Sequence, residues 1–160
     1  MAVASDLVGL LREASSMVLV CHDNPDPDCL MSAVVLQHIA RDCGLTDTTI
    51  ASSGAISHQQ TRTLVNVLDL DLSLTDEIAQ RHADLVAFID HSGAVAHAEE
   101  TPDGPVDIVI DSHPLRDGLE AAFIDVREQY GATATILGEY LRDLAVDVPS
   151  ELASAVLFAI

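Results

Sequence analysis

The stretch of sequence that decides the fold is Met17-Val18-Leu19-Val20-Cys21-His22-Asp23-Asn24-Pro25-Asp26-Pro27-Asp28. Its first five residues form a continuous apolar run, which is typical of a buried strand, and a helix-like run follows from Leu30 to Ala40. One histidine and two carboxylates, His22, Asp26 and Asp28, stand directly after the strand, and prolines fix their spacing. Such a segment contributes little to folding but suits a divalent metal ion, so it is the first candidate for a functional site.

The rest of the chain alternates between strands and helices. Helices are predicted at Ala2–Ala14, Leu30–Cys43, Gln59–Leu68, Leu74–Arg81, Thr133–Leu144 and from Ser150 onward, and strands at Met17–Cys21, Thr48–Ser52, Leu85–Ile89, Val106–Ile110 and Ala121–Val126. Continuous apolar strands that alternate with helices are typical of a parallel sheet that is covered on both faces. We therefore expect a single α/β domain over residues 1–160, with a mainly parallel sheet of about five strands and helices on both faces.

The charge balance is strongly acidic, with 26 acidic residues against 7 basic ones, all of them arginine. Such a surface repels itself in dilute buffer, and concentrated salt screens the repulsion, so the composition predicts a halophilic protein in a salty cytoplasm. The same charge disfavours binding to long duplex nucleic acid. No apolar stretch is long enough for a membrane span and the first residues lack a secretory pattern, so a cytoplasmic location is expected.

Polar residues follow three of the predicted strands at the same point: His22 with Asp26 and Asp28 after Cys21, Asp90-His91 after Ile89, and Asp111-Ser112-His113 after Ile110. The ends of parallel strands share one edge of a sheet, and open α/β sheets place their ligand sites there. Carboxylates that crowd together raise one another's pKa unless cations restore the charge balance. The sequence therefore predicts a metal site at this edge.

Carboxylate oxygens with one or two imidazoles suit Mn²⁺, with Mg²⁺ or Co²⁺ as alternatives. Two such ions, about 3.5 to 4 Å apart, would hold both the attacking and the leaving oxygen at a phosphorus centre and lower the pKa of a water between them. Hydrolysis of a phosphoester or a phosphoanhydride is the reaction that fits this chemistry.

The segment H-D-N-P-D-P-D-C-L-M-S-A at residues 22–33 resembles the first motif, H-x-N-P-D-x-D-x-x-x-S, of the DHH phosphoesterase superfamily. Asp90 is similar to the second motif, and Asp111-Ser112-His113 to the D-H-H signature. The superfamily includes RecJ-type exonucleases, oligoribonucleases, exopolyphosphatases and manganese-dependent inorganic pyrophosphatases.

This resemblance implies a division of roles among the acidic residues. His22 and Asp26 would hold one Mn²⁺ and Asp28 the other, while Asp90 would bridge the two ions, and Asp111 would belong to the same metal centre.

The resemblance also implies which groups meet the substrate. His113 would contact the phosphate and stabilise the developing anion, so that His113 and Asp90 are the expected catalytic residues. Arg116 is a candidate for a second phosphate contact, and a surface arginine is the alternative. Thr133 and Thr135 are interpreted as a helix start, whose N-terminus could also face the cleft.

Two departures from the family pattern qualify these expectations. Ser112 stands where the family has the first histidine of D-H-H, a ligand of the second ion, and a serine hydroxyl is a far weaker ligand; His91 is the candidate to replace it. The family's last metal-binding aspartate would fall a few residues beyond Ile160, and its second domain is absent. We therefore expect an N-terminal fragment of a longer protein, inactive or weakly active alone.

The expected function is manganese-dependent hydrolysis of phosphate esters of nucleotides or short oligonucleotides. Two alternatives stay open: a nucleotide-binding regulatory domain whose catalysis is impaired at Ser112, and a pyrophosphatase or exopolyphosphatase. The sequence leaves both the substrate and the oligomeric state undecided.

Overall fold

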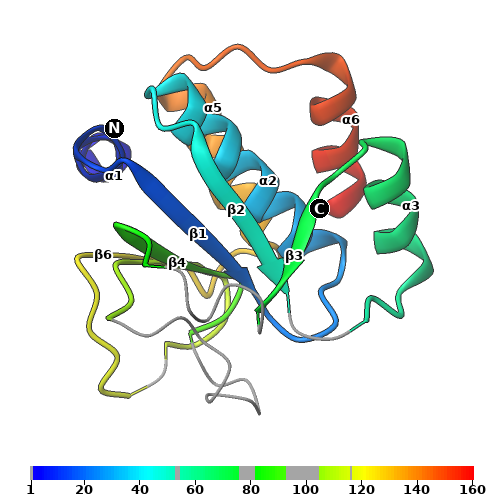
Figure 1. The fold of residues 1–160 in the computed structure, drawn as a ribbon, viewed down its shortest axis with the longest axis horizontal. Helices are drawn as coiled ribbons and strands as arrows, with labels where there is room; N and C mark the ends of the chain where they lie inside the picture. Colours follow the sequence, from blue (N-terminus) through cyan, green and yellow to red (C-terminus); the bar gives the residue numbers. More distant parts are fainter. Residues whose placement is uncertain (1, 53–54, 76–81, 93–104, 116) are drawn as a thin grey trace.

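The computed structural model describes the whole chain except residues 1, 53–54, 76–81, 93–104 and 116 (Figure 1). Its strands are β1 (Ser16–Cys21), β2 (Asp47–Ser52), β3 (Leu72–Leu74), β4 (Leu85–Ile89), β5 (Ile108–Asp111) and β6 (Phe123–Val126). They form one six-stranded sheet in the order β3-β2-β1-β4-β5-β6, and every neighbouring pair is parallel. The prediction of an α/β fold with a parallel sheet is confirmed.

The prediction of about five strands is corrected to six, because β3 was missed. This strand has only three residues and pairs with β2 through Ile50 and Leu72. A short edge strand is fixed by backbone pairing with its neighbour rather than by a run of apolar residues, so the sequence carries little signal for it. Leu74, which was predicted to start a helix, ends this strand instead, and residues 76–81 of that predicted helix lie outside the described residues.

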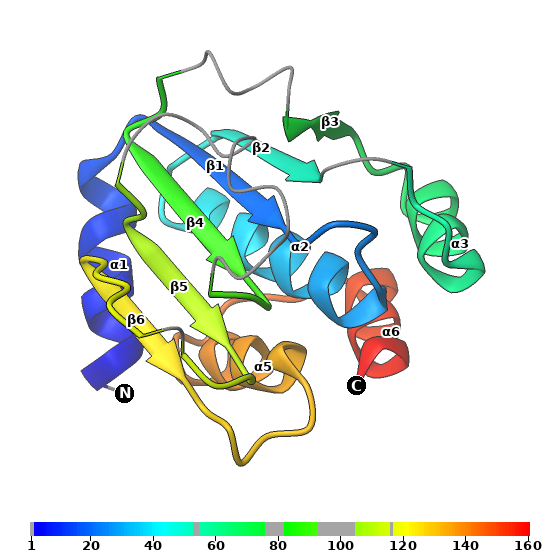
Figure 2. The same cartoon turned by 90° about the horizontal axis from the view of Figure 1, so that it is seen from below.

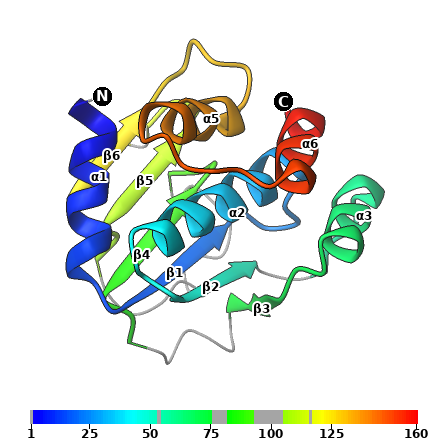
Figure 3. The same cartoon turned by 90° about the horizontal axis from the view of Figure 1, so that it is seen from above.

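The described helices are α1 (Ala2–Glu13), α2 (Pro27–Asp42), α3 (Gln59–Val67), α5 (Thr133–Asp143) and α6 (Ser150–Ala159). Helices α1, α2 and α5 lie on the same face of the sheet, as Figures 2 and 3 show from opposite sides. Helix α6 packs on α2. Most of the helix predicted at Leu74–Arg81 lies outside the described residues, so the structure does not test where it packs.

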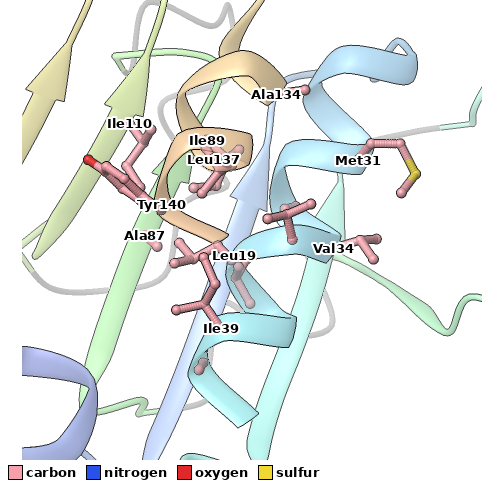
Figure 4. Close-up of a cluster of buried hydrophobic side chains, with 14 of the residues drawn as sticks. Leu19, Met31, Val34, Ile39, Ala87, Ile89, Ile110, Ala134, Leu137 and Tyr140 are labelled. Atoms are coloured by element: carbon pink, nitrogen blue, oxygen red, sulfur yellow. The ribbon is translucent and has the colours of Figure 1, made fainter. Parts of the chain in front are cut away.

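The main core lies between the sheet and helices α2 and α5 (Figure 4). Leu19, Ile89 and Ile110 project from β1, β4 and β5 toward Leu137 and Tyr140 of α5, and all five side chains are buried. A smaller cluster, which includes Val18 and Phe88, covers the opposite face of the same strands. Burial on both faces explains why these strands read as continuous apolar runs.

The strand order creates a crevice in the middle of the sheet. After β1 the chain builds β2 and β3 on one side, and it then crosses to build β4, β5 and β6 on the other side. Open α/β sheets bind ligands where the strand order reverses in this way, outside the carboxyl ends of the strands. A ligand site is therefore expected at the ends of β1 and β4.

Among the residues that the structure describes, no helix combines the length and apolar character that a membrane span requires.

Candidate functional site

Strands β1 and β4 bring His22 and Asp90 together. Cys21 and Ile89 are register partners, and the next residue on each strand carries the polar side chain. Nε2 of His22 lies 3.6 Å from Oδ2 of Asp90, whose side chain is only 3% exposed. Asp90 has a positive φ of 62°, a left-handed conformation that aspartate adopts more readily than most residues. Its backbone N–H donates to the Ile110 carbonyl at 2.9 Å, which fixes this turn at the end of the strand.

The ring of His22 is oriented for use of its Nε2 atom. Nδ1 lies 2.9 Å from the carbonyl oxygen of Asp23. Because a carbonyl oxygen only accepts, Nδ1 carries the proton and the neutral ring keeps a lone pair on Nε2, as a metal-binding imidazole requires. The hydrogen bond with Asp90 raises the pKa of His22 to about 9, so in the absence of an ion the ring is protonated. A metal ion that binds Nε2 has to displace that proton.

Asp26 combines a structural and a candidate binding role. One of its oxygens, Oδ1, accepts the backbone N–H of Cys29 at 3.0 Å and so caps α2, whose first residue is Pro27. The same oxygen lies 4.0 Å from Nε2 of His22, and the side chain of Asp26 is 47% exposed. Capping therefore leaves much of this carboxylate accessible to an ion beside His22.

Asp28 is held by a different helix. Its Oδ2 accepts the N–H of Thr133 at 2.9 Å, and its Oδ1 accepts the N–H of Ala134 at 2.7 Å and the hydroxyl of Ser32 at 3.4 Å. Both oxygens thus face the first turn of α5, where helix N–H groups carry partial positive charge. Burial raises the pKa of Asp28 to about 6. The structure therefore uses Asp28, which was expected to hold the second ion, as a cap of α5.

Asp111 and His113 form a pair at the end of β5. Oδ1 of Asp111 accepts the backbone N–H of His113 at 2.9 Å and lies 2.9 Å from its ring Nδ1. Asp111 is fully buried, and within the described part of the chain its Oδ2 has no hydrogen-bond partner. The bond to Asp111 raises the pKa of His113, whose side chain is 65% exposed. His113 therefore presents a ring to solvent that Asp111 holds in place.

Thr133 links Asp90 to Ser112. Its hydroxyl donates to Oδ1 of Asp90 at 2.6 Å, accepts the backbone N–H of Ser112 at 2.9 Å, and lies 3.1 Å from Oγ of Ser112. Thr133 is fully buried. We predicted it as a helix start whose N-terminus could also face the cleft, and its contact with Asp90 joins residues too far apart in sequence for any local pattern to indicate. Its place in a hydroxyl-rich helix start after D-S-H was the one available signal.

Of two other candidates, one is placed by the structure and the other lies outside the described residues. Nε2 of His91 bonds to the Val20 carbonyl at 2.9 Å, and its ring stacks on Phe88 with centroids 4.7 Å apart. Burial lowers the pKa of His91. One of the two ring nitrogens of His91 is thus engaged with the backbone of β1. Arg116, the candidate phosphate contact, lies outside the described residues.

Two groups of side chains offer ligand atoms within 4.8 Å of one another among the described residues: His22 with Cys29 and Asp90, and Asp90 with Asp111 and His113. The first group, with Asp26 beside it, supplies one imidazole and two carboxylates, a donor set that fits Mn²⁺. Cys29 is a poor ligand, because burial raises the pKa of its thiol and Sγ donates to the Ile89 carbonyl at 3.3 Å.

A cavity of about 270 Å³ opens over these groups and is lined by His22, Asp90, His91, Ser92, Asp111, His113 and Pro114. The structure thus brings His22, Asp90, Asp111 and His113 to one cavity, with Asp26 at its edge and Asp28 turned toward α5.

Known proteins share this sequence pattern and fold. The family model for the DHH family, N-terminal domain, matches residues 16–160. An uncharacterized protein of Methanocaldococcus jannaschii is 35% identical over 149 residues, which cover 93% of this chain and 30% of that protein. A probable manganese-dependent inorganic pyrophosphatase of Staphylococcus saprophyticus is 28% identical over 142 residues, which cover 87% of this chain and 45% of the relative.

A crystal structure of an exopolyphosphatase-related protein from Bacteroides fragilis has the same fold, with a TM-score of 0.78 and 16% sequence identity. The match covers 98% of this chain and 48% of that one. The chain therefore spans less than half the length of each of these proteins.

Proposed function

The chain belongs to the DHH family, and on that premise we propose that it is the metal-binding domain of a hydrolase that cleaves phosphate esters or anhydrides with Mn²⁺. The observation that carries the proposal is the placement of His22 Nε2 at 3.6 Å from Asp90 and 4.0 Å from Asp26, at two neighbouring strand ends. When bound, Mn²⁺ supplies a Lewis acid for a phosphoryl oxygen and lowers the pKa of a water. His22, Asp26 and Asp90 are the residues proposed to hold it.

His113 is proposed to bind the phosphate itself. Asp111 fixes the His113 ring through Nδ1 and through the backbone N–H, and raises its pKa, so that the ring favours the cationic form. This leaves Nε2 of the exposed ring to donate to a phosphate oxygen. A pre-oriented cation of this kind stabilises negative charge that develops in the transition state, because it needs no reorganisation during the reaction.

Small phosphate compounds are the proposed substrates. We propose nucleotides or short oligonucleotides as the first class and inorganic pyrophosphate as the second, which the similarity to a probable manganese-dependent inorganic pyrophosphatase supports. The acidic balance of the chain, with 26 acidic and 7 basic residues, disfavours long polyanions in either case.

The test is a hydrolysis assay on the full-length protein with Mn²⁺, in which mononucleotide release from a dinucleotide is compared with phosphate release from adenosine bisphosphate and from pyrophosphate at equal concentration. The Asp90→Asn variant is the matched control, since asparagine tolerates the left-handed backbone at this position. Manganese-dependent release that disappears in the control supports a hydrolase. The proposal fails if the wild-type protein hydrolyses none of the three.

A second candidate function is a nucleotide-binding regulatory domain without turnover. The observation that favours it is the state of the second ion position, where Ser112 replaces a histidine and both oxygens of Asp28 bond to α5. A regulatory domain would bind a nucleotide and leave it intact, and Ser112→His would raise hydrolysis from near zero. Appreciable turnover by the wild-type full-length protein would exclude this candidate.

A further inference from the structure

The first turn of α5 lies against the proposed metal site. Thr133 and Ala134 stand at the N-terminus of this helix, and together they contact Asp28, Asp90 and Ser112. These three residues occupy the places where the family pattern expects the donors of a second ion. What α5 does there determines how many ions the site can hold.

Both oxygens of Asp28 accept hydrogen bonds from α5 in this arrangement. Its two oxygens accept the N–H groups of Thr133 and Ala134 at 2.9 and 2.7 Å, so each lone pair that faces α5 is used. The N-terminus of a helix favours a negative charge through its free N–H groups and its dipole. Backbone N–H groups therefore supply part of the compensation that an ion would otherwise give to the charge of Asp28.

The hydroxyl of Thr133 performs the same function for Asp90. A hydroxyl has one proton, and because the carboxylate only accepts, Thr133 donates that proton to Oδ1 of Asp90 at 2.6 Å. Its lone pairs are then left for Ser112, whose N–H lies 2.9 Å away. Oδ2 of Asp90, on the other side of the carboxylate, faces His22 at 3.6 Å. Asp90 thus directs one oxygen toward the His22 side and gives the other to Thr133.

Helix α5 is anchored so that its first turn stays in this position. Arg127, just beyond β6, bonds to Asp125 at 2.8 Å and to Glu139 of α5 at 2.6 Å, and Tyr140 of α5 also donates to Asp125. Tyr130 donates to Glu139 at 2.9 Å. Because these contacts tie α5 to the edge of the sheet, the turn that holds Asp28 and Asp90 is preorganised.

In the other group of possible ligand atoms around Asp90, the histidine already interacts with the two carboxylates. Nδ1 of His113 lies 2.9 Å from Oδ1 of Asp111 and 3.6 Å from Oδ1 of Asp90. One oxygen of each carboxylate therefore already has a partner, and this partner is the ring proposed to bind phosphate.

We infer that the N-terminal turn of α5 takes the place of the second metal ion, so that this site holds one divalent ion, and that Thr133 is a positioning residue which orients Asp90 toward that ion. The inference rests on the proposed metal dependence. It commits the ion to the His22, Asp26 and Asp90 side of the cavity.

The ion count tests the inference directly. Mn²⁺ bound to the full-length protein is measured by titration calorimetry and by metal analysis after gel filtration, and the count for Asp90→Asn is subtracted, because Asp90 touches both positions. A difference of one ion is expected. A difference of two overturns the inference and leaves the proposed metal-dependent function standing, whereas a difference of zero overturns both.

The positioning role of Thr133 is tested by variants that differ in one group. Thr133→Val removes the hydroxyl and keeps the shape, and it should weaken Mn²⁺ binding about tenfold, as is typical when a group that orients a metal ligand is lost. Thr133→Ser keeps the hydroxyl and should restore the affinity. Thr135→Val makes the same change in the same turn of the helix and should leave the affinity unaltered.

The unfolding midpoint without metal is measured for each variant, so that a folding defect is recognised. Equal Mn²⁺ affinity of Thr133→Val and wild type would overturn the positioning role. If Thr133→Val does not fold, Thr133→Ser takes over the test. A tenfold loss of Mn²⁺ affinity in Thr133→Ser, which keeps the hydroxyl, would also overturn the positioning role. The ion count tests the inference in either case.

Discussion

Asp26 and Asp28 stand two positions apart in one motif, yet they serve different helices. Asp26 caps its own helix α2 with one oxygen and stays 47% exposed beside His22. Asp28 caps the distant helix α5 with both oxygens. The motif specifies two carboxylates, but the helix N-terminus that each one meets decides whether it remains available to an ion.

We expect the largest loss of Mn²⁺ affinity at His22, which lies beside the exposed carboxylate of Asp26. His22→Ala removes the imidazole that faces Asp90 at 3.6 Å and should weaken Mn²⁺ binding at least 100-fold, which is more than the 10 to 100-fold typical for groups that only orient a ligand. Calorimetric titration of the full-length protein measures it. His38→Ala is the control, since His38 bonds to the Asp147 carbonyl away from the site, and it should bind as the wild type does.

The matched pair Asp26→Ala and Asp28→Ala tests the comparison most directly. Each variant loses a helix cap, so both should be destabilised by about 1 kcal/mol in urea unfolding. Only Asp26→Ala should lose Mn²⁺ affinity, by tenfold or more, while Asp28→Ala stays within about threefold of wild type, because its oxygens bond to α5. Equal loss of affinity in both variants would mean that Asp28 ligates an ion after all.

The anchor of α5 should also matter for stability. Tyr140 is buried and donates to Asp125, so Tyr140→Phe should lower the free energy of unfolding by about 1.5 kcal/mol, as is typical for a hydrogen bond to a charged group. Tyr130→Phe, which loses the bond to the more exposed Glu139, should cost less. Urea unfolding of the two variants measures the difference, and an equal cost would contradict this account.

The smallest expected effect depends on pH. Bonds from Tyr130 and Arg127 hold the pKa of Glu139 below its ordinary value. A carboxyl with a lowered pKa stabilises the fold above its unfolded pKa of about 4.3, and this contribution disappears as the pH falls through the lower folded value. The stability difference between wild type and Glu139→Gln should therefore be present at neutral pH and vanish in acid. A difference that stays constant in unfolding curves down to about pH 3.5 would refute this.

Most of the fold could be predicted because the strands β1, β4 and β5 are buried on both faces and therefore read as continuous apolar runs. The start of α2 was set too late, at Leu30 instead of Pro27, since a proline in the first turn was interpreted as part of the loop. Strand β3 could not be predicted, because its three residues owe their conformation to pairing with β2.

The residue types of the candidate site could be predicted, but only part of its geometry. Because the carboxyl ends of parallel strands share one edge of the sheet, we could predict that His22, Asp90 and His113 meet. The structure places them around one cavity. That Asp28 faces Thr133 and Ala134 depends on how α5 docks on the sheet, which no local spacing encodes. The same holds for the contact between Thr133 and Asp90.

The order of the strands ties the folding of the chain to its ligand. Strands β1 and β4 are neighbours in the sheet, yet Met17 pairs with Leu85 across a long intervening stretch of chain that builds β2 and β3. An ion shared by His22 and Asp90 would cross-link the two halves of the molecule and close that loop, and links that close long loops restrict the unfolded chain most. Loading the ion and completing the sheet would then be a single cooperative event, so that neither half alone could retain the metal.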